Sequence, residues 1–211
     1  MVAVPRSWPG ETVVCVATGP SLTQGDVDFC RGKARVIVIN DAYQLAPWAD
    51  ALYACDARWW GWHGGVPSFT GAKWSLEHSA WSNRTSKKFA DVQRLKNAGP
   101  DGLCREPTGL KNGRNSGYQA INLAFLYGAK RIVLLGYDMQ RSGGKTHFFG
   151  DHQYAASSPP FDQFRRRFQS IVKPLAKSGV TVINSTRRSV LECFPKQPLE
   201  TVFAPQMESV A

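Results

Sequence analysis

Long apolar runs are missing from this chain of 211 residues. No run approaches the roughly 18 consecutive apolar residues that a membrane-spanning helix needs. The N-terminus also lacks a long apolar core followed by a small-residue cleavage site, so we expect no secretory signal. Repeats of the kind found in coiled coils, collagen and solenoids are absent. With 43% hydrophobic and 20% charged residues, the composition is typical of a soluble globular protein, and the length favours a single domain over residues 1–211.

Cysteine is scarce, and its spacing shows no pairing pattern. The five cysteines are odd in number, and no CxxC motif occurs. This argues against a zinc ribbon and against a disulfide scaffold. Cys15 lies in an apolar run, where cysteine behaves as a small hydrophobe. We therefore expect reduced thiols and a cytoplasmic location.

Acidic residues are outnumbered by basic ones. The chain has 16 Asp and Glu residues against 26 Lys and Arg residues, which gives a net charge of +10. This balance favours anionic partners, such as phosphates, nucleotides, nucleic acid or an acidic surface. A solvated basic surface that only keeps the protein in solution is the alternative interpretation.

Five short runs rich in β-branched residues predict strands. Their apolar residues are nearly continuous rather than alternating, which is typical of strands buried on both faces of a parallel sheet. We therefore expect an α/β fold with an open, mainly parallel sheet and helices on both faces. The expected strands are 12–17, 35–40, 51–54, 131–135 and 180–184.

Two helices are predicted between these strands. The first covers 116–127 and is followed by Gly128, a common helix stop. The second follows a pair of prolines, repeats apolar residues at helical spacing over 161–175, and stops at Gly179. The three arginines at 165–167 interrupt this pattern, so we expect at least two of them to face outward. They form either a solvated face or a phosphate-contacting one.

The stretch 59–113 is rich in tryptophan and in small polar residues. We expect it to be irregular, with one amphipathic helix near 90–96, and to form an active-site insertion, a lid or an acceptor site. Its aromatic and basic residues would suit base stacking, whereas the alternative is that the tryptophans fill a small satellite core. The Pro-rich tail after Phe194 is expected to be poorly ordered or packed along the surface.

Small and polar residues follow every predicted strand, and ligands bind at the carboxyl ends of strands in open α/β sheets. The segment 19–21, which reads GPS, permits close approach of a ligand, although it belongs to neither a P-loop nor a GxGxxG motif. A tight structural turn is the alternative interpretation of this segment. The segment 113–117, which reads GRNSG, precedes the first predicted helix. Asn115 or Ser116 can cap that helix, while exposed amides and Arg114 can bind an anion.

The segment 147–152, which reads HFFGDH, is the best candidate for acid–base chemistry. Histidine titrates near neutral pH, and Asp151 can orient the ring of His147 or His152. Two histidines and a carboxylate can also bind a metal, and structural loop histidines are the third interpretation. The DxD at 26–28 follows the first strand rather than a middle strand, so we interpret it as turn or helix-start chemistry and not as the metal motif of sugar-nucleotide enzymes.

Taken in order, these segments resemble the bacterial sialyltransferases of the Campylobacter type and the related domain-of-unknown-function proteins that include archaeal pterin diphosphokinases. The resemblance spans about residues 12–193. Asp56 is a departure, because the family carries Asn at that place. The matching segments are ATGPSL at 17–22, VINDAY at 38–43, YACD at 53–56, RNSG at 114–117, LGYD at 135–138 and FGDH at 149–152.

The resemblance implies a Rossmann-like, metal-independent glycosyltransferase that binds a cytidine nucleotide sugar and needs no cofactor. It implies that the segment ending in His152 carries the general base. With His152 in that role, we expect Asp151 and His147 to lie nearby and Tyr137 or Tyr154 to stabilise the leaving phosphate. The expected nucleotide contacts are Gly19, Pro20, Ser21, Asn40, Asp56, Arg114, Asn115, Ser116, Gly117 and Asp138.

Two other functions stay open from the sequence. One is a diphosphokinase-like transfer from ATP, in which magnesium would bind near carboxylates such as Asp56 and Asp138. The other is a non-catalytic module for nucleic acid or a nucleotide signal, which the charge and the aromatic stretch motivate. Glycosyl transfer onto a DNA acceptor would fit both the net charge and the expected site. An oligomer is possible under each of these functions.

Overall fold

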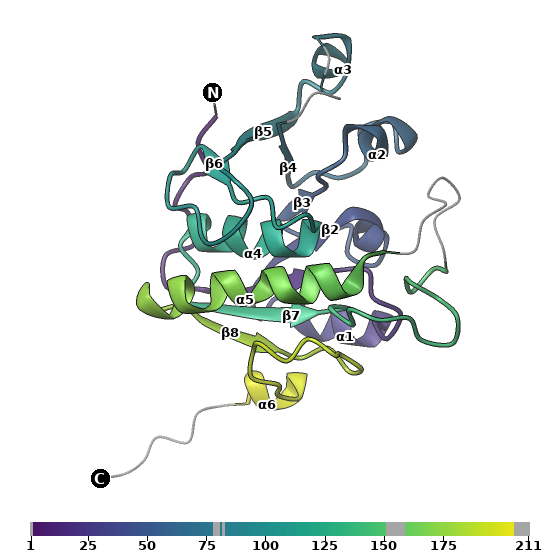
Figure 1. The fold of residues 1–211 in the computed structure, drawn as a ribbon. Helices are drawn as coiled ribbons and strands as arrows, with labels where there is room; N and C mark the ends of the chain where they lie inside the picture. Colours follow the sequence, from purple (N-terminus) through teal and green to yellow (C-terminus); the bar gives the residue numbers. More distant parts are fainter. Residues whose placement is uncertain (1, 78–80, 82, 151–158, 205–211) are drawn as a thin grey trace.

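The computed structural model describes residues 2–77, 81, 83–150 and 159–204. Its centre is an 8-stranded sheet with the order β6-β5-β4-β3-β2-β1-β7-β8 (Figure 1). Every pairing between these strands is parallel. The strands are β1 Thr12–Val16, β2 Arg35–Ile39, β3 Ala51–Tyr53, β4 Ala72–Leu76, β5 Val92–Asn97, β6 Gly109–Leu110, β7 Arg131–Leu135 and β8 Thr181–Asn184.

Both faces of the sheet are covered, which confirms the predicted fold class. Side chains alternate between faces along a strand, so Val13 and Cys15 of β1 enter one core cluster, while Val14 and Val16 enter the other. Because both clusters are apolar, the strands appear as continuous hydrophobic runs in the sequence.

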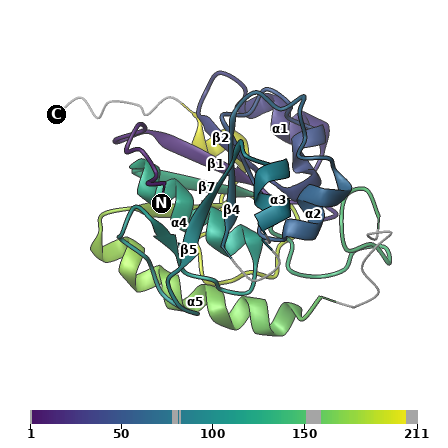
Figure 2. The ribbon, with the colours of Figure 1, turned by 90° about the horizontal axis from the view of Figure 1, so that it is seen from above.

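Helices form the outer layers. Residues of α4 and α5 pack in the first cluster, and residues of α1, α2 and α6 pack in the second. Figure 1 and Figure 2 show α4 and α5 side by side on one face and α1 on the other. The helices are α1 Gln24–Cys30, α2 Ala57–Trp62, α3 Asn83–Lys88, α4 Ser116–Tyr127, α5 Phe161–Lys177 and α6 Leu199–Val202, with a 3-10 turn η1 at Asn40–Gln44.

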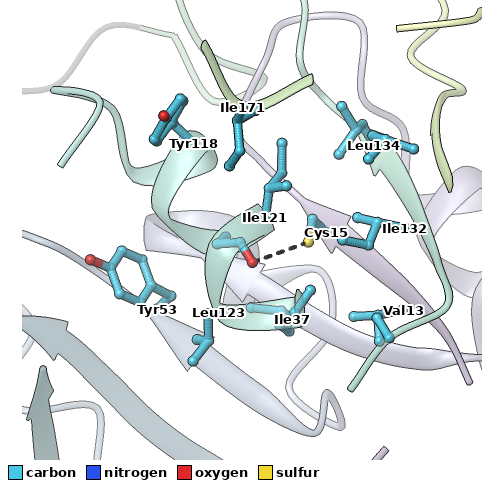
Figure 3. Packing of buried hydrophobic residues seen from close by; sticks show 14 of the residues in the cluster. Val13, Cys15, Ile37, Tyr53, Tyr118, Ile121, Leu123, Ile132, Leu134 and Ile171 are labelled. Carbon is cyan, nitrogen blue, oxygen red and sulfur yellow. Dashed lines mark hydrogen bonds between the residues drawn. The ribbon is translucent and has the colours of Figure 1, made fainter. Parts of the chain in front are cut away.

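The helix α4 lies directly on the central strands (Figure 3). Ile121 and Leu123 of α4 are fully buried in the same cluster as the strand residues Ile37 and Ile132. The Cys15 thiol donates a hydrogen bond to the Ala120 carbonyl at 3.7 Å, and burial raises its pKa. Cys15 is therefore a core residue with a protonated thiol, in keeping with the sequence.

The stretch 59–113 differs from the expectation of an irregular segment. It supplies three further strands, β4 to β6, which extend the sheet on the β3 side. The helix expected near 90–96 is wrong, because Val92–Asn97 pairs with β4 as strand β5. Val92 and Leu95 are buried three residues apart, which mimics a helical pattern in the sequence.

The tryptophans of this stretch are mostly buried, but in the main core and not in the small satellite core of the alternative interpretation, since they belong to the two clusters that cover the sheet. Trp59, Trp60, Trp74 and Trp81 are buried, and Trp62 is 41% exposed. The role of the stretch as a lid or acceptor site stays a prediction.

The chain after Phe194 packs on the sheet as far as the structure describes it. Leu199 and Val202 of α6 are buried in one cluster with Ile183 of β8. Among the described residues, no helix combines the length and apolar character needed to cross a membrane.

Candidate functional site

A pocket lies where the topology of the sheet switches direction. From β1 the chain continues to β2 on one side, whereas β7 and β8 lie on the other side. Loops diverge at such a point, which is where α/β sheets bind ligands. A cavity of about 280 Å³ opens there. We call it the switch-point pocket, and its walls are the loop after β1, Asn40, the start of α4, the loop after β7, Thr146 with His147, and the start of α5.

Gly19 lets the loops after β1 and β7 approach each other closely. Its amide donates to the Gly136 carbonyl at 2.8 Å. A Cβ atom at Gly19 would overlap the Gly136 carbonyl oxygen and the Asp138 carboxylate, whose Cγ would be only 2.7 Å away. This crowding explains why glycine occupies the position. Pro20 follows it in the pocket wall.

Several residues that line the same pocket have left-handed backbone conformations. Among the described non-glycine residues, positive φ occurs at Asn40 (49°), Val66 (48°), Arg114 (54°) and Met139 (54°). All but Val66 line the switch-point pocket. Such conformations are unfavourable for residues with a side chain, and they concentrate at functional sites. Three separate segments are therefore strained where they shape one cavity.

The start of α4 forms the anion-attracting end of the pocket. The Asn115 side chain accepts the Tyr118 amide at 3.1 Å, so Asn115 and not Ser116 is the cap among the two residues that the sequence offers. Ser116 and Gly117 begin the first turn, where amides have no partner within the helix and the helix dipole is positive. Arg114 adds an exposed guanidinium to the wall.

Asp138 provides a hydrogen-bond acceptor in the pocket wall. It is 1% exposed, and its Oδ1 accepts the Ser21 amide at 3.0 Å. Its Oδ2 is buried and has no hydrogen-bond partner among the described residues. Burial raises the pKa of this carboxyl, and hydrogen bonds with Ser21 offset part of that effect. A ligand that donates a hydroxyl or amine proton would satisfy the unpaired oxygen.

His147 stands in the pocket wall with its ring held in place. Its Nδ1 lies 2.8 Å from the Thr18 hydroxyl, and its ring stacks on Phe149 with centroids 5.1 Å apart. The Phe148 amide donates to the Thr18 carbonyl at 3.0 Å. Thr18 therefore fixes the orientation of a titratable ring beside the pocket.

Tyr137 does not line the pocket, although the sequence predicts it at the leaving phosphate. Its ring is fully buried, and its hydroxyl donates to the Gly117 carbonyl at 3.0 Å. Burial raises its pKa well above the ordinary value, so the hydroxyl keeps its proton. Tyr137 therefore supports the first turn of α4 from within the core.

Other expected site residues are distributed differently. Ser21 is not in the pocket wall; its amide holds Asp138, and its hydroxyl accepts the Arg188 amide at 3.3 Å. Asp56 caps α2 and pairs with Arg58 at 2.7 Å, outside the pocket. In the diphosphokinase alternative, magnesium would bind near both Asp56 and Asp138. The two carboxylates do not share this cavity, because Asp138 lines it and Asp56 does not. The remaining expected residues, Asp151, His152 and Tyr154, lie outside the described part of the chain.

The DxD at 26–28 has the helix-start role that the sequence predicts. Asp26 forms a capping box with Thr23 at the start of α1. It also accepts hydrogen bonds from the Arg187 guanidinium, whose Nη2 donates to Oδ1 at 2.6 Å and whose Nε lies 3.0 Å from both carboxylate oxygens. Burial opposes the charge of Asp26, but the hydrogen bonds from Arg187 and Thr23 outweigh it and lower the pKa.

Several pocket residues were not predicted as site residues from the sequence. The sequence feature that could have identified them is their place along the chain, because most of them follow β7 or begin α5. The principal ones are Met139, Gln140, Thr146, Phe161 and Phe164.

The fold has a counterpart among solved structures. No family model matches the chain, and no curated protein matches it in sequence. A similar solved structure is that of the sialyltransferase CstII from Campylobacter jejuni, in complex with a substrate analogue, cytidine-5'-monophosphate. The match has a TM-score of 0.55 and 13% sequence identity, and it covers 90% of this chain and 86% of that chain. The chain therefore has a sialyltransferase-like α/β fold.

Proposed function

We propose that this protein is a glycosyltransferase that binds a nucleotide sugar of the cytidine monophosphate type in the switch-point pocket. The observation that carries the proposal is the two-sided chemistry of the pocket. The start of α4 with Arg114 suits an anion, and the unpaired Oδ2 of Asp138 suits a hydroxyl or amine donor. A nucleotide carries both groups. The fold shared with a sialyltransferase studied with cytidine-5'-monophosphate supports the same ligand class.

Each group has a distinct task in this proposal. Arg114 and the first amides of α4 offset the charge of the donor phosphate. Asp138 and Asn40 hold the hydroxyl and amine groups of the nucleoside. The acceptor oxygen attacks the anomeric carbon of the sugar, and the bond from that carbon to the phosphate oxygen breaks. The electron pair leaves with the nucleotide, and a histidine takes the acceptor proton.

The first test is nucleotide binding. Isothermal titration is expected to show that cytidine monophosphate binds the wild type. Arg114→Ala is expected to weaken this binding by about 10-fold or more, because a hydrogen bond to a charged group contributes about 1.5–3 kcal/mol. Arg105→Ala is the matched control, since Arg105 is exposed and pairs with Ser178 away from the pocket. Wild-type protein that fails to bind the nucleotide, or equal losses in both variants, would contradict the proposal.

The second test is turnover. We expect His152→Ala to abolish release of cytidine monophosphate from a nucleotide-sugar donor while nucleotide affinity stays within about 2-fold, because a general base contributes about 10²–10⁴-fold to rate. His147→Ala is measured beside it, since His147 is held in the pocket wall by Thr18. Turnover that survives in His152→Ala and disappears in His147→Ala would move the base to His147. Turnover that survives in both would remove the histidine base from the proposal.

A further inference from the structure

The switch-point pocket continues into a groove along α5. A second hollow of about 630 Å³ shares Gln140, Pro159 and Phe161 with the pocket. A third hollow of about 350 Å³ shares Gln163 and Arg166 with the second. We call the second and third hollows together the α5 groove. It leads away from the pocket past the first turns of α5, between residues 159 and 170.

The wall of the groove is cationic. Four arginines line it against two aspartates, so positive charge prevails and the groove favours an anion. The arginines are Arg141, Arg165, Arg166 and Arg167, and the aspartates are Asp101 and Asp162.

The arginines of α5 are not equivalent. Arg165 pairs with Asp162, and Arg167 pairs with Asp101 at 2.6 Å. The Arg166 side chain is exposed, and its guanidinium forms no hydrogen bond or ion pair with any residue that the structure describes. It stands where the two hollows meet, so its guanidinium is available to an anionic ligand in either of them.

The junction with the pocket is apolar. Phe161 is half-buried and lines both the pocket and the groove, beside Pro159. An aromatic ring beside a cationic wall suits a ligand that carries both a planar or sugar ring and a phosphate.

We propose that the α5 groove binds the acceptor and that this acceptor carries phosphate groups. The inference rests on the proposed function, because the donor nucleotide is assigned to the adjoining pocket. Residues 161–170 of a helix span about 14 Å at 1.5 Å per residue. That length exceeds one phosphate group and fits a short phosphodiester chain. A small phosphorylated acceptor has the same chemistry but would fill only the part of the groove next to Phe161.

The test compares two charge reversals on α5. Arg166→Glu and Lys173→Glu change the net charge equally, and Lys173 is exposed on the same helix outside the groove. Seven residues make nearly two turns, so both side chains leave the helix in a similar direction. The probe is a fluorescein-labelled single-stranded oligonucleotide, followed by fluorescence anisotropy. We expect Arg166→Glu to raise its Kd by about 10-fold or more and Lys173→Glu by less than about 2-fold.

Salt dependence gives a second readout. The association constant falls with salt, so log K has a negative slope against log salt. For a single strand, removing one phosphate-binding cation makes this slope shallower by about 0.7. We expect this change in Arg166→Glu and no such change in Lys173→Glu. Equal changes in both variants would show that the oligonucleotide senses only the overall charge, and they would overturn the inference. Wild-type protein that binds neither the oligonucleotide nor a ribose phosphate would overturn it too.

Competition distinguishes the two sources of phosphate. Displacement of the oligonucleotide by a ribose phosphate at similar molar concentration would assign the groove to a small acceptor, whereas resistance to it would assign a chain. Cytidine monophosphate affinity is measured in parallel and is expected to be unchanged in Arg166→Glu. A marked fall in that affinity would place the donor in the groove and overturn the acceptor assignment. Wild-type protein that binds the oligonucleotide through Arg166 but never binds cytidine monophosphate would instead refute the proposed function.

Discussion

Gly19→Ala is expected to lower the free energy of unfolding by about 3 kcal/mol and to abolish nucleotide binding, because overpacking a tight site costs about 1–3 kcal/mol or more. The added Cβ would overlap the Asp138 carboxylate and the Gly136 carbonyl oxygen. One of these groups is backbone, so the two loops must separate to admit the methyl group. Urea denaturation measures the stability, and titration with cytidine monophosphate measures the binding.

A nearby glycine supplies the control for this substitution. Gly25 lies in the first turn of α1, and a Cβ there would meet only the Thr23 hydroxyl, at 3.8 Å. Gly25→Ala is expected to be neutral or to stabilise the protein by up to about 1 kcal/mol, because alanine favours helix more than glycine. If Gly19→Ala were as stable as Gly25→Ala, the close approach of the two loops would not be a requirement of the fold.

Asp138→Asn is expected to strengthen the fold while it weakens the ligand site. The substitution keeps an oxygen for the Ser21 amide and removes a buried charge whose second oxygen has no partner among the described residues. We expect a gain in the free energy of unfolding on the order of 1 kcal/mol at pH 8, because burial disfavours the charged carboxylate and asparagine carries no charge. We expect nucleotide affinity to fall by about 10-fold or more, because a hydrogen bond to a charged acceptor disappears.

The pH dependence of this gain follows from the raised pKa of Asp138. A carboxyl whose pKa is higher in the folded than in the unfolded state favours folding when protonated. That contribution is fully present below the unfolded pKa and disappears as the pH rises through the folded pKa. The gain from Asp138→Asn should therefore be near zero in acid and grow as the pH rises through the folded pKa. A gain that is constant with pH would show that the buried charge is not its cause.

Much of the fold could be predicted where helix caps, helix stops and the pattern of apolar residues indicate the same element. The helix 116–127 was predicted with its observed bounds, because Asn115 caps it and Gly128 ends it at a φ of 104°. The strand 131–135 was likewise predicted as observed. The expected ends of β1, β2 and β3 extend one residue too far. At β2 the reason is Asn40, which has left-handed backbone and begins η1.

For other segments, pairing between strands determines the secondary structure and the local sequence pattern does not. The strand β5 reads VQRLKN, in which the buried residues are spaced as in a helix, and its pairing with β4 and β6 makes it a strand. The site shows the same limit. Tyr137 and Asp138 follow a predicted strand, and this position predicts that both lie near the ligand. The sequence does not say which of the two adjacent side chains enters the core. The structure buries Tyr137 under Gly117 and places Asp138 in the pocket wall.

The pocket is assembled from segments that are far apart along the chain. The Ser21 amide meets Asp138 across 117 positions, and Thr18 meets His147 across 129 positions. Interactions of such sequence separation form only when the chain has closed large loops. Nucleotide capture should therefore be a property of the finished sheet and not of any fragment, which makes the ligand a reporter of complete folding.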